Sequence, residues 1–126
     1  MVYLLDTHAL LWFLKDDKQL SQNALNVIET NNIKVSIATL WEIAIKTSLG
    51  KLILPAPFEV IFPQQLYIND IAIIQTSIEH LSQLNQLEFH HRDPFDRLLI
   101  AQAMVESITL ISRDKAFKDY DVKVIW

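Results

Sequence analysis

The first twelve residues, MVYLLDTHALLW (1–12), contain both kinds of element from which the chain is built. Residues 2–5 form an apolar run without polar alternation, which is typical of a strand that is buried on both faces. From His8 to Leu14 the apolar side chains recur at helical spacing. A buried strand followed directly by a helix predicts a parallel sheet that helices cover on both sides.

The same alternation continues through the rest of the chain. We expect further strands at residues 34–37, 71–74 and 109–111, a fifth at 122–125, and helices at 21–31, 39–49, 57–69, 77–87 and 94–107. Asp93-Pro94 is typical of a helix start and Gly50 of a helix end, while Pro63 predicts a kink or a break. The sequence therefore predicts a three-layer α/β/α fold around a mainly parallel sheet of four to five strands.

The composition predicts one folded domain over residues 1–126. Hydrophobic residues make up 51% of the chain and charged residues 21%, which excludes a disordered protein. The absence of cysteine excludes disulfides, cysteine–zinc sites and thiol nucleophiles. The single glycine excludes the glycine-rich phosphate loops of nucleotide-binding folds.

Charge and hydropathy limit the partners and the compartment. A net charge of −4 excludes a protein that coats nucleic acid through bulk positive charge. No apolar run approaches the ~20 residues that a membrane helix needs, and the N-terminal residues lack the basic segment of a signal peptide. We therefore expect a cytoplasmic protein with no membrane span.

Four carboxylates are expected near the carboxyl ends of the predicted strands, namely those of Asp6, Glu42, Asp96 and Asp114. Each one also has a purely structural interpretation. Asp6 and Asp114 are candidate helix N-caps, Asp96 complements a helix dipole, and residues 39–42 read as a capping box whose Glu42 pairs with Lys46.

Their conjunction favours a metal site, because the carboxyl ends of parallel strands meet at one edge of a sheet. Two like charges ~4 Å apart repel by about 4 kcal/mol at an effective dielectric constant near 20. A divalent cation removes that repulsion, and ligands that are all oxygens favour Mg²⁺ or Mn²⁺ over zinc. Such ions keep waters that can serve as nucleophiles.

The chain also resembles a known family, the PIN domains, and within it the VapC-type toxin nucleases of bacterial toxin–antitoxin pairs. The resemblance rests on four segments in the family's order: LLDTHALLW at 4–12, SIATLWEIAIK at 36–46, HRDPFDRLLIAQA at 91–103 and LISRDKAF at 110–117. They span nearly the whole chain, and the first and third together are a specific pairing.

The resemblance implies a PIN-like domain whose acidic pocket holds Mg²⁺ or Mn²⁺ and hydrolyses RNA, with a cognate antitoxin as partner. The positions that match the family's catalytic and metal-site carboxylates are Asp6, Glu42, Asp96 and Asp114. Thr7 matches an accepted form of the first motif, and Ser112 matches a small hydroxyl residue two positions before the last acid. Asp93 is outside the family's core pattern, and we expect it to be an N-cap.

Basic residues gather late in the sequence, and we expect them to contact RNA phosphates without reading bases. The candidates are Arg92, Arg97, Arg113, Lys115 and Lys118, of which Arg97 is favoured because it adjoins Asp96. A solvated face of mixed charge is the alternative for each of them.

The histidines and aromatic residues have weaker interpretations. His8 is expected at the mouth of the pocket or as an ordinary helix residue, and His80 on the surface. His90 and His91 lack the spacing of a zinc site. Trp41 lies on a helix that is apolar nearly all round, which predicts burial. With the surplus of aromatic residues, this helix indicates a partner, either a second copy of the chain or an antitoxin, and we expect a homodimer.

Two other classes of function share some of these features. A phosphoacceptor domain needs paired acids after its first strand and an aspartate after its third, whereas this chain has Asp6 alone and Gln75. A dehalogenase-like phosphatase needs Asp-x-Asp, and here the residues are Asp6-Thr7-His8. A non-catalytic binding module is disfavoured because all four acids are present.

Overall fold

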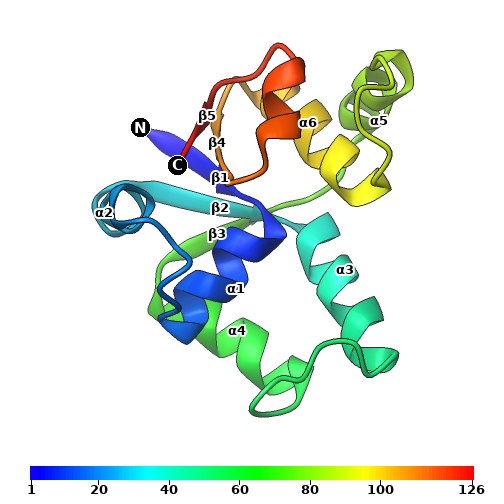
Figure 1. Cartoon of the computed structure of the whole chain (residues 1–126). Helices are drawn as coiled ribbons and strands as arrows, with labels where there is room; N and C mark the ends of the chain where they lie inside the picture. The colour runs from blue at the N-terminus through cyan, green and yellow to red at the C-terminus, as the bar shows by residue number, and fades with distance from the viewer.

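A parallel five-stranded sheet runs through the middle of the computed structural model, which describes residues 1–126 (Figure 1). Its strands are β1 (Val2–Leu5), β2 (Asn32–Ser36), β3 (Ile71–Ile74), β4 (Thr109–Ile111) and β5 (Val124–Ile125). Their order across the sheet is β3-β2-β1-β4-β5, and every neighbouring pair is parallel. The predicted α/β class and parallel sheet are confirmed.

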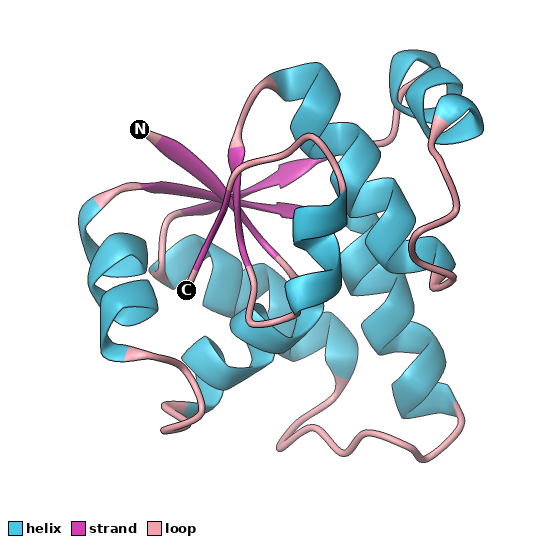
Figure 2. Ribbon diagram, turned by 45° about the horizontal axis from the view of Figure 1, so that its top comes forward, coloured by secondary structure: helices cyan, strands magenta, loops and turns pink.

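Helices cover both faces of this sheet, which gives the predicted three layers (Figures 1 and 2). They are α1 (Thr7–Lys15), α2 (Gln22–Thr30), α3 (Ile37–Ser48), α4 (Phe58–Ile68), α5 (Ile78–Gln86) and α6 (Pro94–Glu106), followed by a short 3₁₀ helix, η1 (Lys115–Asp119). Figure 1 shows α1, α2 and α4 on one side of the sheet and α5 and α6 on the other. None of these helices is long and apolar enough to cross a membrane.

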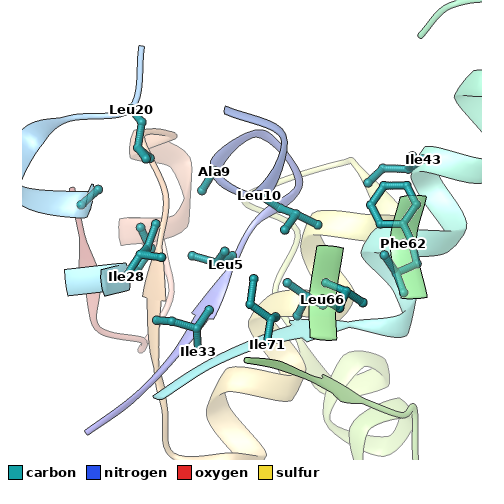
Figure 3. Packing of buried hydrophobic residues seen from close by; sticks show 14 residues of the cluster. Leu5, Ala9, Leu10, Leu20, Ile28, Ile33, Ile43, Phe62, Leu66 and Ile71 are labelled. Atoms are coloured by element: carbon teal, nitrogen blue, oxygen red, sulfur yellow. The ribbon is translucent and has the colours of Figure 1, made fainter. Parts of the chain in front are cut away.

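Two hydrophobic clusters lie on opposite faces of the sheet. Leu5 belongs to the cluster that contains Leu10 and Phe62, which Figure 3 shows packed between β1, α1 and α4. The adjacent Leu4 belongs to the other cluster, with Ile100 of α6 and other residues. Successive residues of β1 are therefore both buried, and this explains why the strand shows no polar alternation.

Several element boundaries differ from those predicted. Helix α3 begins at Ile37 and not at Thr39, because the Ser36 side chain accepts a hydrogen bond from the backbone N–H of Ala38 at 3.0 Å and caps the helix. The predicted capping box at residues 39–42 is therefore wrong, and Glu42 lies in the second turn. Helix α4 continues through Pro63 without a break.

The strand order places the functional edge of the sheet. From β1 the chain leads to β2 on one side, and it later returns to pair β4 with the other side of β1. Ligands of open α/β sheets bind at the carboxyl ends of the strands, where the order of strands reverses in this way. The chain segments that leave β1 and β4 meet at this point, since the backbone N–H of Asp6 donates to the carbonyl of Ile111 at 3.2 Å.

Candidate metal centre

Asp6 and Asp114 follow the two strands at the reversal point. Each is the N-cap of the next helix, so the structural interpretation holds for both: Asp6 Oδ1 accepts from the N–H of Ala9 at 2.8 Å, and Asp114 Oδ1 accepts from the N–H of Ala116 at 2.9 Å. Because capping occupies one oxygen of each carboxylate, the other oxygen is left for a further partner. Ser112, two residues before Asp114, is buried. Its hydroxyl accepts from the N–H of Asp114 at 3.0 Å.

Glu42 is buried on α3, and other side chains contact both of its oxygens. Thr7 donates its hydroxyl to Oε1 at 2.7 Å, and Lys46 donates to Oε2 at 2.6 Å. Thr7 thus joins α1 to α3, while Lys46 supplies a positive charge one helical turn away. The pairing of Glu42 with Lys46 is as predicted.

Asp96 lies in the first turn of α6, held by the cap that precedes it. Asp93 Oδ1 accepts from the N–H groups of Phe95 and Asp96 at 2.9 and 3.1 Å, which confirms the predicted N-cap. The free carboxylate of Asp96 faces the loop before α6, where its Oδ2 lies 3.1 Å from Nε2 of His91. The same imidazole nitrogen lies 3.3 Å from Oδ2 of Asp114.

The electrostatics show that Asp6 and Asp96 lie in a crowded acidic environment. Burial is the main cause that raises the pKa of Asp96 to about 7; Asp93, Asp6 and Glu42 raise it further, while His91 lowers it. Burial likewise raises the pKa of Asp6, and Asp114 adds to the effect, although hydrogen bonding from Ser112 and Ala9 opposes it. The four acids therefore interact through space at one edge of the sheet.

The donor atoms fit a small hard cation. Ligand atoms of Asp96, Asp114 and His91 all lie within 4.8 Å of one another, whereas Asp6 and Glu42 stand outside this tight group. Two oxygens on opposite sides of Mg²⁺ are about 4.2 Å apart, since each Mg–O bond is ~2.1 Å. Carboxylate oxygens match Mg²⁺ or Mn²⁺ better than a softer metal.

A hollow of about 240 Å³ opens beside the acids, lined by Asp6, His8, Trp12, Arg113 and Asp114. His8 stacks on Trp12 with ring centroids 5.3 Å apart, and the Arg113 guanidinium lies over the same indole at 4.5 Å. His8 therefore lies at the mouth of the hollow. A larger hollow of about 580 Å³ between α1 and α2 is lined by none of the four acids.

The basic residues predicted to contact RNA divide into two groups. Arg92, Arg113, Lys115 and Lys118 are exposed. Arg97 is buried, because its side chain turns away from Asp96 and donates to the carbonyls of Glu88 and Leu87 at 2.9 and 3.4 Å. The expectation that Arg97 is the favoured RNA contact is therefore wrong.

Two other expectations about exposure are also wrong. Trp41 is 60% exposed, and it packs edge-on against Phe95 of α6 with centroids 5.1 Å apart. His80 is buried, because its Nδ1 accepts from the N–H of Ser77 and closes a capping box at the start of α5. The burial of His80 depends on the cap contact with Ser77, and the exposure of Trp41 depends on how much of α3 the rest of the chain covers; the helical pattern specifies neither.

Sequence reasoning missed His91 as part of the acidic edge. Adjacent histidines suggest a zinc site, and without a partner at helical spacing they carry no other recognisable functional signal. The signal that was present is its place in the HRDPFD segment, five residues before Asp96. A loop that leads into a helix at the carboxyl edge of a sheet brings its own side chains to that edge.

Comparisons with known proteins agree with this geometry. A family model described as PIN domain matches residues 3–123. No curated protein sequence matches the chain.

Three solved structures illustrate the likeness of fold. A structure of VapBC2 from Rickettsia felis bound to a DNA fragment from its promoter has a chain 19% identical, with a TM-score of 0.74 over 100% of this chain and 99% of that one. FitAcB from Neisseria gonorrhoeae gives 18% identity and a TM-score of 0.72 over 100% and 97%. A toxin–antitoxin complex from Klebsiella pneumoniae gives 18% and 0.68 over 98% and 96%.

Proposed function

This chain belongs to the PIN domain family, and from that membership we propose that it is a metal-dependent endoribonuclease and the toxin of a toxin–antitoxin pair. The observation that carries the proposal is the gathering of Asp6, Glu42, Asp96 and Asp114 at the reversal point of the sheet, with the pKa values of Asp6 and Asp96 raised. The similar toxin–antitoxin complex from Klebsiella pneumoniae supports the role of toxin.

The four carboxylates are the proposed catalytic and metal-binding residues. Asp96 and Asp114 would hold the ion most directly, Asp6 would offer the oxygen that its cap leaves free, and Glu42 would act from the position that Thr7 and Lys46 fix. A bound Mg²⁺ or Mn²⁺ supplies Lewis acidity at the scissile phosphate and lowers the pKa of a water. Thr7 and Ser112 keep the carboxylates in place through hydrogen bonds.

RNA would be held by the exposed basic residues next to this edge, which are Arg92, Arg113 and Lys115. Phosphate contacts of this kind position a strand without reading its sequence. An enzyme that cuts cellular RNA would act in the cytoplasm. All five strands, from β1 to β5, belong to one sheet, which supports a single domain over residues 1–126.

The direct test is incubation of the full chain with end-labelled RNA in Mn²⁺, in Mg²⁺ and in EDTA, next to DNA of the same sequence. We expect cleavage products from RNA in the two metal buffers and none in EDTA or with Asp96→Asn. Cleavage that persists in EDTA would exclude the metal-dependent mechanism. Phosphatase activity on a small phosphate ester without RNA cleavage would favour the phosphatase class.

A cognate antitoxin and a second copy of the chain are the proposed protein partners. Exposed apolar side chains support them, since Trp41 of α3, Leu49 directly after α3 and Tyr67 of α4 face solvent in the single chain. We expect a homodimer by light scattering at micromolar concentration, and loss of RNA cleavage when the antitoxin is co-expressed. A monomer at that concentration would remove the first partner, and unchanged cleavage would remove the second.

A further inference from the structure

The loop between α5 and α6, residues 87–93, brings one side chain onto the acidic edge. His91 is largely buried there, with 16% of its side chain exposed, and its Nε2 lies between Asp96 Oδ2 at 3.1 Å and Asp114 Oδ2 at 3.3 Å. These two carboxylates belong to different elements, α6 and the start of η1. His91 is therefore the one side chain that contacts both of them.

A buried pair of side chains fixes the course of this loop. The Tyr120 hydroxyl accepts from the backbone N–H groups of His90 and His91 at 3.0 and 2.9 Å, and donates to the carbonyl of Glu88 at 2.8 Å. Arg97 donates to the same carbonyl and to the Tyr120 oxygen at 3.3 Å. We call this pair the Arg97–Tyr120 clamp.

The clamp has a physical cost that its contacts offset. Burying a guanidinium or a phenol without partners is unfavourable, so these groups are retained where hydrogen bonds satisfy them. Here the guanidinium and the phenol are satisfied by backbone carbonyls and N–H groups of the loop. The effect of the clamp is to hold the backbone of His91 in one place.

The hydrogen bond on the other side of the ring selects its tautomer. Nδ1 of His91 accepts from the backbone N–H of Asp93 at 3.3 Å, so the proton of the neutral imidazole resides on Nε2. That N–H points at the two carboxylates. An imidazole nitrogen that carries a proton has no lone pair for a metal, and so His91 acts here as a donor and not as a metal ligand.

We propose that His91 is a positioning residue of the metal centre: its Nε2–H holds the carboxylates of Asp96 and Asp114 together, and the Arg97–Tyr120 clamp holds His91. Asp114 needs such a partner, because its side chain is 46% exposed and only one of its oxygens is fixed by capping η1. Donors that orient ligand groups typically contribute a factor of about 10–100 in metal affinity. This inference rests on the proposed function.

The test measures Mn²⁺ binding by the full chain, by titration calorimetry, and does not use RNA. His91→Phe keeps the ring that packs against Phe117 with centroids 5.9 Å apart, but removes the donor. His91→Gln restores an N–H. We expect Mn²⁺ affinity to fall about tenfold or more in His91→Phe and to recover most of that loss in His91→Gln.

Two further variants separate the clamp from general stability. Tyr120→Phe removes the hydroxyl that holds the loop and touches neither carboxylate, and we expect it to weaken Mn²⁺ binding in the same direction as His91→Phe. His90→Gln is the matched control, since the His90 side chain pairs with Glu88 and packs on the ring of Tyr120, leaving the Tyr120 hydroxyl in place, and it reaches neither Asp96 nor Asp114. We expect His90→Gln to bind Mn²⁺ as the wild type does.

The outcomes distinguish this inference from the proposed function. Wild-type affinity in His91→Phe, or equal losses in the Phe and Gln variants, overturns the positioning role; the second result would make His91 a direct ligand. A wild-type chain that binds Mn²⁺ but leaves RNA intact overturns the proposed function and not the role of His91. A wild-type chain that binds no Mn²⁺ overturns both.

Discussion

Asp6 and Asp114 each perform two tasks with the two oxygens of one carboxylate. One oxygen caps a helix, as the local sequence predicts, and the other faces the acidic edge. The structural and functional interpretations of these residues are therefore compatible. A charge-neutral amide keeps an oxygen for the cap but carries no negative charge, so substitution by Asn separates the two roles.

Asp96→Asn should abolish RNA cleavage and leave the fold intact. The loss should exceed the ~10–100-fold that follows removal of an outer partner of a metal site. In metal-free buffer the variant should melt no lower than the wild type, because the charge it removes is repelled by Asp93, Asp6 and Glu42. Glu106→Gln, at the exposed end of the same helix, is the control; a variant of Asp96 that unfolds would contradict the prediction.

The stability of the metal-free protein should decrease as the pH rises from about 4 to about 7. The pKa of Asp96 is raised to about 7 in the folded chain from a usual value of 3.8. Between these values the unfolded chain loses a proton that the folded chain keeps, and ionisation then favours unfolding. Thermal melts at several pH values should show the advantage of Asp96→Asn growing across this range and then levelling off. If the stability advantage of Asp96→Asn shrank as the pH rose, the prediction would be contradicted.

Removal of the charge should lower stability at Arg97 and weaken RNA binding at Lys115. Arg97→Met leaves buried carbonyls without donors, and we expect it to lower the free energy of unfolding by about 1–3 kcal/mol. Lys115→Gln, on the surface, should change stability by less than about 0.5 kcal/mol but weaken the binding of unrelated RNAs alike. Chemical denaturation and filter binding measure the two effects.

At the scale of the element, the best test is the start of α6. Asp93→Ala removes the acceptor for two backbone N–H groups and should cost about 1 kcal/mol of unfolding free energy. Asp93→Ser keeps an acceptor and should restore most of it. Because Asp93 also raises the pKa of Asp96, both variants should shift the pH dependence of metal-free melting to lower pH. Equal stability of the Ala and Ser variants would exclude the cap.

The elements also show what the sequence could predict. The bounds of β1, β3 and β4 match the prediction, because short apolar runs buried on both faces differ sharply from their flanks. The predicted start of α3 at Thr39 is wrong because Ser36 and Thr39 can both cap a helix, and local chemistry does not choose between them. The positions of Asp6 and Asp114 after two neighbouring parallel strands follow from the strand pattern.

Side-chain environments were less predictable, because they depend on contacts far along the chain. Arg97 is buried by carbonyls of the preceding loop and by Tyr120, and no spacing rule connects these groups. Trp41 is exposed because a helix that is apolar all round in sequence covers only part of its surface within one chain. His91 reaches the acids through a loop whose course the clamp fixes.

For the whole molecule, the charge balance predicts how RNA binding depends on the metal. The chain carries a net charge of −4 and a cluster of carboxylates next to a few basic residues, so a phosphate backbone is repelled until a cation neutralises the cluster. RNA affinity in Ca²⁺ should clearly exceed affinity in EDTA, and its dependence on salt should be shallow because few phosphates are contacted. Equal affinities, or a steep dependence on salt, would place RNA on another surface.

The pairing of β1 with an early strand, β2, and a late strand, β4, has a consequence for biosynthesis. A ribosome that has made the chain only through α5 has produced Asp6 and Glu42, but neither Asp96 nor Asp114. At that stage β1 also lacks one neighbour, since β4 comes later. The nuclease that we propose could not attack its own messenger RNA or its ribosome while the residues up to the end of α5 emerge. If the chain is the toxin that we propose, an antitoxin would need to capture it only after β4 and Asp114 have left the ribosome.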